Sequence, residues 1–203
     1  MLSNAFNNAV TEGIEINDIS ALMTAATKGD IPSIQKYIDK YGAQHLDAVR
    51  GEPIGYTALM WAAKDGNVAG VSFMLDQGSS LERPDMHGET PLIIAAWMGR
   101  TELVLELLRR GADDRRRNDD GLDALGKALK HGHVETAEAL RKFRADQDAK
   151  IASEKKAHCI AMEKAREVFR RGIPEKLKQQ IAHFKRGNGP QHPGAHGALR
   201  HGR

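Results

Sequence analysis

Residues 88–99 read GETPLIIAAWMG, and this stretch decides the fold because it recurs along the chain. Residues 55–66 read GYTALMWAAKDG and residues 121–132 read GLDALGKALKHG. Each copy begins and ends with glycine, and the step from Gly55 to Gly88 equals the step from Gly88 to Gly121. A fixed period of this kind is typical of repeat architectures, in which each unit buries its apolar face against its neighbours.

Each unit has the pattern of two short helices joined by a tight turn. Thr57, Thr90 and Asp123 are typical N-cap residues for the first helix, and Pro91 suits its first position. The closing glycine of each copy is expected to end that helix in a left-handed cap. A second helix is predicted next, because residues 103–108 place leucine and valine on one helical face.

A weaker copy precedes these three. Residues 21–30 match residues 58–67, but the step between them is slightly longer than the regular period. The extra residues fall within 41–53, a stretch that reads as a loop, where a solenoid tolerates insertions. We therefore expect about four repeats.

The pattern Gly-x-Thr-Pro-Leu-x-x-Ala-Ala-x-x-Gly followed by Leu-Leu-x-x-Gly-Ala-Asp resembles the ankyrin repeat. The unit over 88–114 resembles it most, and the whole resemblance covers roughly residues 20–146. It implies an all-α ankyrin-repeat solenoid of helix-turn-helix repeats with hairpin loops, followed here by a C-terminal helical extension. The last unit departs from the pattern, with Phe143 and Arg144 where a glycine is expected.

The family usually carries a histidine after the leucine of its Thr-Pro-Leu motif, and this histidine links neighbouring repeats. The equivalent positions here hold Met23, Met60, Ile93 and Gly126. We therefore expect apolar packing in place of that hydrogen-bond network.

The composition is that of an ordinary water-soluble chain of 203 residues, with 40% hydrophobic and 28% charged residues. The single cysteine, Cys159, excludes a disulfide within one chain. The sequence shows neither a secretory signal nor an apolar run long enough to span a membrane. A cytoplasmic location is the expectation, with a translocated bacterial effector as the alternative.

Charge divides the chain into two parts. Residues 1–140 hold 14 Lys and Arg against 21 Asp and Glu, a net charge of −7, whereas residues 141–203 hold 16 against 6, a net charge of +10. The expected boundaries are an N-terminal segment over 1–19, the repeats over 20–146, a basic helical extension over 147–186, and a disordered Gly/Pro/His-rich tail over 187–203. A second helix of the extension is expected to fold back and cap the last repeat.

No enzyme motif is present: the sequence has no phosphate-binding loop, no nucleophile elbow and no paired histidines on a metal-binding helix. We therefore expect no catalytic residue, no cofactor and no metal site. The predicted function is non-enzymatic binding of another protein, of unknown identity.

The resemblance implies a binding surface made of hairpin tips and the exposed side of each first helix. Trp97 and Met98 should point to solvent there, flanked by Tyr56, Met86 and Leu122, whereas Trp61 should lie in the core. Exposed aromatic and methionine side chains in one place are typical of interface anchors. The full predicted surface is Tyr56, Lys64, Asp65, Met86, His87, Glu89, Trp97, Met98, Arg117, Asp119, Leu122, Lys130 and His131.

Two other functions stay open at this point. The basic part over 147–203 could contact nucleic acid or another polyanion weakly, and the chain could be a regulatory subunit of a partner enzyme. A steep salt dependence of binding would favour the first of these, because phosphate contacts release counterions.

Overall fold

The computed structural model describes residues 14–49, 55–170, 172, 175–176 and 178–179. Throughout these residues the regular structure is helical, without a β-strand. The chain divides into two compact units, residues 1–147 and 148–203. The all-α class expected from the sequence is therefore confirmed.

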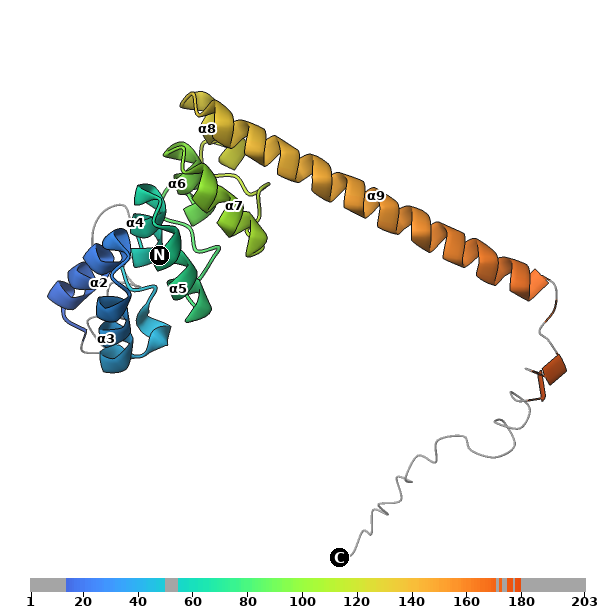
Figure 1. Ribbon diagram of the computed structural model, residues 1–203, viewed down its shortest axis with the longest axis horizontal. Coiled ribbons are helices and arrows are strands. Elements are labelled where there is room, and N and C mark those ends of the chain that lie inside the picture. The colour runs from blue at the N-terminus through green and yellow to red at the C-terminus, as the bar shows by residue number, and fades with distance from the viewer. Residues whose placement is uncertain (1–13, 50–54, 171, 173–174, 177, 180–203) are drawn as a thin grey trace, which may run out of the picture. The chain divides into compact units, whose positions relative to one another are not determined.

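The first unit is a stack of helix pairs, each with an inner helix followed by an outer helix (Figure 1). Successive inner helices pack on one another, and so do the outer helices of neighbouring pairs. The inner helices are α2 (Ile16–Lys28), α4 (Ala58–Asp65), α6 (Pro91–Trp97) and α8 (Ala124–Lys130). The outer helices are α3 (Ile31–Tyr41), α5 (Val68–Asp76), α7 (Thr101–Arg109) and the first turns of α9 (Val134–Arg170), and the 3-10 turn η1 (Ala43–His45) follows α3. The four helix pairs confirm the solenoid and include the weak first copy.

The inner helices begin where the sequence predicts. Thr57, Thr90 and Asp123 are the N-caps of α4, α6 and α8, and each side chain accepts a hydrogen bond from the backbone N–H three residues later. These bonds measure 3.3, 3.4 and 2.7 Å. Gly66 ends α4 in the left-handed region with φ 83°, as a C-cap glycine does.

The core of the solenoid begins ahead of the expected boundary at residue 20. Helix α2 starts at Ile16, and both Ile14 and Ile19 are buried in the main core. Small residues line the contacts between inner helices, because Ala62 and Ala95 are fully buried there. Their short side chains allow the backbones of α2, α4 and α6 to approach closely.

Apolar side chains fill the positions of the family's linking histidine. Met60 and Ile93 are completely or almost completely buried, at 0% and 1% exposed. The Met60 sulfur also accepts a hydrogen bond from the backbone N–H of Thr57 at 3.4 Å, which adds to the cap of α4. The expected replacement of the histidine network by apolar packing therefore holds at these two positions.

A ladder of hydrogen bonds connects the repeats instead. The residue that follows the C-cap glycine of one inner helix reaches back to the last turn of the previous inner helix. The three contacts join Asn67 to the carbonyl of Thr27 (3.3 Å), Arg100 to that of Lys64 (3.1 Å) and His133 to that of Trp97 (2.8 Å). Because each contact passes over a glycine, the ladder explains why the repeat keeps glycine there as well as for its backbone conformation.

We expect Gly99→Ala to destabilise the solenoid by about 2–3 kcal/mol, against about 1 kcal/mol for Gly132→Ala. Both glycines have positive φ, 67° and 75°, so both variants carry backbone strain. An added Cβ at Gly99 would lie 2.5 Å from the His133 ring, whereas at Gly132 it meets no described atom within 4 Å. Urea denaturation of the two variants measures the difference, and equal losses would mean that the His133 contact contributes nothing.

Helix α9 is longer than the sequence suggested. The expected boundary after residue 146 does not interrupt the backbone, and one helix of 37 residues runs from Val134 to Arg170. The reason is local: this stretch has no glycine or proline and is rich in Ala, Lys, Glu and Arg, which favour helix. Side chains over 145–169 are exposed.

The rest of the extension is described only at residues 172, 175–176 and 178–179, of which the last four are helical. The expected second helix therefore lies largely outside the described residues, and its capping of the last repeat stays a prediction. The N-terminal segment to residue 13 and the tail over 187–203 lie outside them as well. Where helices are described, none combines the length and apolar character that crossing a membrane requires.

Candidate functional site

The inner helices α2, α4 and α6 enclose a groove of about 450 Å³, here called the aromatic groove. Both tryptophans of the chain line it, one from α4 and one from α6. Its lining residues are Ser20, Met23, Thr24, Thr27, Lys28, Tyr56, Trp61, Lys64, Asp65 and Trp97. The groove therefore combines a large aromatic surface with two lysines and a carboxylate.

The aromatic groove lies on a small apolar cluster that is separate from the main core. Tyr56, Met60 and Ile94 are its buried members, and Trp61 packs against them half-buried. The rings of Tyr56 and Trp61 meet edge to face with centroids 5.6 Å apart. Burial raises the pKa of Tyr56 to about 12, so its hydroxyl stays protonated at neutral pH. Trp61 packs against both apolar clusters, as expected of a core residue, but it is only partly buried and also lines the groove.

Each tryptophan is held by a lysine of the chain itself. The Lys64 ammonium lies 5.0 Å from the centroid of the Trp61 ring, and that of Lys127 lies 5.4 Å from the Trp97 ring. Trp97 also contacts the ring of His131 at 5.7 Å between centroids. These cation–π contacts restrict the rings while leaving both side chains partly accessible.

The lysine that contacts the Trp97 ring also belongs to a buried ion pair. Lys127 of α8 pairs with Glu89, which stands just before the N-cap of α6, and their side chains are only 9% and 7% exposed. The amide of Asn118 donates a further hydrogen bond to Glu89 at 3.3 Å. This network joins the third and fourth repeats beneath the surface.

Two members of the predicted surface are therefore corrected. Tyr56 and Glu89 are 8% and 5% exposed, although the resemblance placed both on the accessible face. Tyr56 turns inward because Trp61, Met60 and Ile94 offer an apolar contact. Glu89 turns inward because Lys127 supplies a buried partner for its charge.

The other predicted residues divide by exposure and position. Tyr56, Lys64, Asp65 and Trp97 meet in the aromatic groove, whereas Met86, Met98 and Leu122 do not line it. Met98 and Leu122 are half-buried, and Met86 is exposed. The remaining exposed members are His87, Arg117, Asp119, Lys130 and His131. The aromatic groove thus joins four of the predicted residues with residues of the first repeat, and a binding role for any of the predicted residues stays a prediction.

Asp85 and Asn118 occupy equivalent positions at the base of two hairpins, but only Asp85 brings a charge into a buried site. One Asp85 oxygen accepts hydrogen bonds from the backbone N–H groups of His87 and Glu89, both at 2.8 Å. Its other oxygen is buried without a partner among the described residues. Burial raises the pKa of Asp85 above its usual range. Asn118, at the equivalent position of the next repeat, makes the same backbone contact to Leu122 at 2.8 Å but carries no charge.

We expect Asp85→Asn to raise the free energy of unfolding at pH 7 by about 1 kcal/mol, because it removes a buried unpaired charge. Since the folded-state pKa of Asp85 is raised, the cost of its charge is present above that pKa and vanishes below the unfolded value. The advantage of the variant should therefore shrink as the pH falls. Urea denaturation at several pH values tests this, with exposed Asp119→Asn as the control, and a constant advantage would contradict it.

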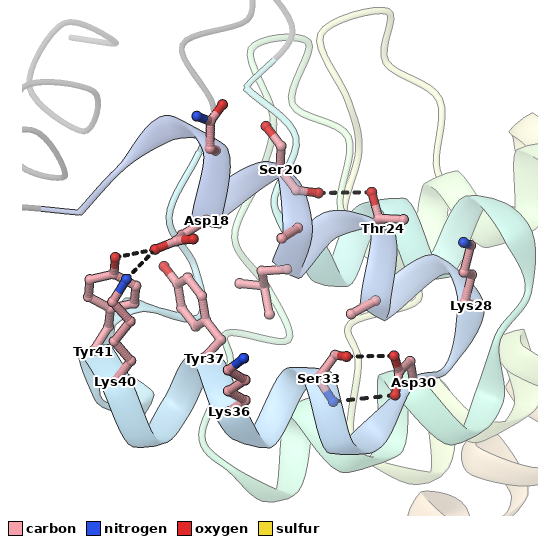
Figure 2. Close-up of a pocket in the computed structure, with 14 residues that line it drawn as sticks. Asp18, Ser20, Thr24, Lys28, Asp30, Ser33, Lys36, Tyr37, Lys40 and Tyr41 are labelled. Carbon is pink, nitrogen blue, oxygen red and sulfur yellow. Dashed lines mark hydrogen bonds and ion pairs between the residues drawn. The ribbon is translucent and has the colours of Figure 1, made fainter.

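A second hollow of about 650 Å³ lies along α2 and α3 (Figure 2). Its charged side chains are largely satisfied by one another. Asp18 bonds to Lys40 at 2.7 Å and also to Tyr41, and these bonds lower the pKa of Asp18. Asp30 accepts a hydrogen bond from the Ser33 hydroxyl at 2.6 Å and caps α3. With its acids committed in this way, this hollow is a weaker candidate for binding than the aromatic groove.

Metal binding finds no support in the part of the chain that the structure describes, where no three metal-ligating side chains come together. The groove is lined by aromatic, hydroxyl and charged side chains and by Met23.

The sequence of the stack matches a known family. A family model described as ankyrin repeats, in three copies, matches residues 22–118. This part of the chain is an ankyrin-repeat domain. The match begins within α2 and runs through α7 to the hairpin that leads to α8, so it includes part or all of the three inner helices that line the aromatic groove.

Ankyrin-repeat proteins are also among its curated relatives. The human SH3 and multiple ankyrin repeat domains protein 2 is 32% identical over 133 residues, which is 65% of this chain and 7% of that protein. The probable E3 ubiquitin-protein ligase XBOS33 of Oryza sativa is 36% identical over 100 residues, 46% of this chain and 19% of that protein. The E3 ubiquitin-protein ligase hecd-1 of Caenorhabditis elegans is 26% identical over 156 residues, which is 63% of this chain and 6% of that protein. The chain thus spans less than a fifth of these relatives.

Trp61 and Lys127 belong to the site but were not predicted as site residues. A sequence pattern that could have identified both is present. Trp61, Ile94 and Lys127 follow one another at the regular period, so they occupy one register position in three successive repeats. A lysine in a register that is otherwise apolar indicates a buried partner, which the structure identifies as Glu89. A tryptophan there is too large for a position that an isoleucine fills, so part of it reaches the surface.

Proposed function

We propose that this chain is a non-enzymatic protein-binding module whose ankyrin-repeat domain holds a partner protein in the aromatic groove. The observation that carries the proposal is the position of the tryptophans. The chain has two, and both are half-buried, with part of each side chain on the lining of the same groove. Tryptophan is the side chain most enriched at binding hot spots, where it buries a large area with little loss of rotamer freedom.

The surrounding residues support the same function. The rings are restrained by Lys64 and Lys127, so little ordering would be needed on binding. Exposed charged residues that line the groove, such as Lys28 and Asp65, would form a polar rim around the aromatic centre. Ankyrin repeats are in general protein-interaction modules, and the relatives carry them within much longer proteins.

We expect Trp97→Ala to weaken capture of the partner about a hundredfold while leaving the helical fold in place. The test compares full-length wild type and variant as baits in the source cell lysate, with quantitative mass spectrometry of the captured proteins. Leu105→Ala is the control, since Leu105 is 37% exposed on the outer helix α7, away from the groove. Undiminished capture by Trp97→Ala would contradict the proposal, and a greatly lowered melting temperature would make Trp97 a core residue.

A second candidate function concerns the basic extension. Residues 141–203 carry a net charge of +10, and the described side chains of α9 beyond residue 147 are exposed. These features favour weak contact with a polyanion through residues 147–203. A salt titration separates the two functions, because phosphate contacts give a steep salt dependence and an aromatic groove gives a shallow one.

A further inference from the structure

The aromatic groove is richer in unused hydrogen-bond donors than in acceptors. Lys28 and Lys64 line it, and neither has a carboxylate within ion-pair distance among the described residues. The indole N–H groups of Trp61 and Trp97 likewise meet no acceptor in the described part of the chain. Neither indole nitrogen is a fully buried orphan, so both remain accessible to a ligand. Asp65 is the one carboxylate among the lining residues.

The three hydroxyl groups that α2 contributes to the groove do not add to these donors. Ser20, Thr24 and Thr27 each donate to the backbone carbonyl four residues earlier in α2, at 2.9, 2.9 and 2.7 Å. Their hydrogens are therefore committed within the helix. The donors left for a ligand are two ammonium groups, of which that of Lys64 also contacts the Trp61 ring, two indoles and the largely buried hydroxyl of Tyr56. Together they favour an anionic, acceptor-rich group.

The floor of the groove is apolar. Met23 and Tyr56 line it and are 8% exposed each, and the Tyr56 ring contacts the half-buried ring of Trp61 with centroids 5.6 Å apart. A volume of about 450 Å³ lies within the usual range for ligand pockets and accommodates a bulky side chain rather than a flat surface. The groove thus presents an apolar slot whose rim carries positive charge.

We propose that the occupant of the groove is a linear protein segment that places one bulky apolar side chain beside one or two carboxylates. The apolar side chain enters between Trp61 and Trp97, and the carboxylates meet Lys28 and Lys64. This inference rests on the proposed function, because it names the chemistry of the partner at the same site.

The charge of the whole repeat region limits the acidity of that segment. Residues 1–140 carry 14 Lys and Arg against 21 Asp and Glu, a net charge of −7. Such a surface repels a long polyanion such as nucleic acid, whose affinity depends on many phosphate contacts. A short acidic motif needs only the two local lysines, so the observations favour a peptide over a nucleic acid.

Tryptophan fluorescence reports directly on this site, because both tryptophans of the chain line the groove. The probe is a phage-displayed library of random linear peptides selected on the immobilised full-length protein. We expect the selected peptides to share an aliphatic or aromatic residue next to aspartate or glutamate. The best peptide, synthesised and titrated into the protein, should change the tryptophan fluorescence to saturation.

Charge variants then test the role of the lysines. The double variant Lys28→Gln/Lys64→Gln should bind the selected peptide about tenfold more weakly than wild type. Replacing the acidic residues of the peptide by their amides should weaken binding to wild type equally but have little further effect on the double variant. The matched control is Lys36→Gln/Lys150→Gln, which makes the same charge change at exposed positions outside the groove and should bind normally.

Three results would overturn the inference. Selected peptides that lack acidic residues or are enriched in lysine and arginine would leave the proposed function standing but refute this partner chemistry. A single-stranded oligonucleotide that displaces the peptide and binds more tightly would make the groove a nucleic-acid site. A library that yields no binder would refute a linear segment, and the capture experiment with Trp97→Ala would then decide separately whether the groove binds a folded protein.

Discussion

Lys127→Met should lower the free energy of unfolding by about 3 kcal/mol, a large share of the stability of a domain of this size. The methionine keeps the length and the apolar stem of the side chain but removes the ammonium. Glu89 then stays in a site that is 7% exposed, and among the described residues the Asn118 amide is its one remaining side-chain partner. An unpaired buried carboxylate costs far more than the loss of a surface ion pair.

The effect should extend to the aromatic groove. The Lys127 ammonium lies 5.4 Å from the centroid of the Trp97 ring. Its loss removes a contact that restrains this ring, which lines the groove. We expect a changed tryptophan emission spectrum in the folded variant in addition to the lower stability.

Urea denaturation with matched variants checks this expectation. Lys130→Met is the control, because Lys130 stands one helical turn later in α8 and is exposed. The double variant Glu89→Leu/Lys127→Met removes both charges and should recover most of the lost stability, since an apolar pair of similar size can replace a buried ion pair. A loss below about 1 kcal/mol for Lys127→Met would show that water reaches Glu89.

The repeat frame could be predicted from the sequence because its signals are local. Thr57, Thr90 and Asp123 cap helices through contacts to residues only three positions away, and each closing glycine acts on its own helix end. Such contacts are visible within a single copy of the repeat. The repetition of the same signals in three copies then fixes the stacking, since a lone helix pair cannot bury its apolar face.

The surface could be predicted only in part, because it depends on contacts between repeats. Resemblance alone places Tyr56 and Glu89 on the accessible face, but long side chains at those positions reach partners in other elements. Tyr56 reaches Ile94 of the next inner helix, and Glu89 reaches Lys127 in the inner helix of the following repeat. Pairs at such separations follow from the three-dimensional stack rather than from the spacing within one copy.

The extent of helix α9 was also predicted only in part. The family pattern has a glycine near residue 144, where this chain has Phe143 and Arg144. Arg144 instead bonds to Asp123 at 2.9 Å and to Asp114, which anchors the helix to the last repeat while its backbone continues without interruption. This stretch has no helix breaker, so one helix continues through it.

Leu92→Ala should lower the free energy of unfolding by about 3 kcal/mol, whereas Leu125→Ala should cost about 1 kcal/mol, although both leucines occupy the same register position. Leu92 is 1% exposed in α6, where the helices α4, α7 and α8 surround it. Truncation there leaves a cavity in the middle of the stack. Leu125 is only partly buried in the last inner helix, so water can fill part of the space that its truncation creates.

The two variants should also differ in how they unfold. A solenoid is stabilised by contacts between neighbouring repeats, so a cavity in the third repeat weakens the link between the first two and the last. Urea unfolding of Leu92→Ala, followed by far-UV circular dichroism and by tryptophan fluorescence, should give transitions that no longer coincide, because Trp61 and Trp97 lie in neighbouring repeats. Coincident transitions would mean that the stack still unfolds as one unit. Equal energetic costs at Leu92 and Leu125 would mean that the last repeat is covered in solution as completely as the third, as the capping role expected for the C-terminal extension requires.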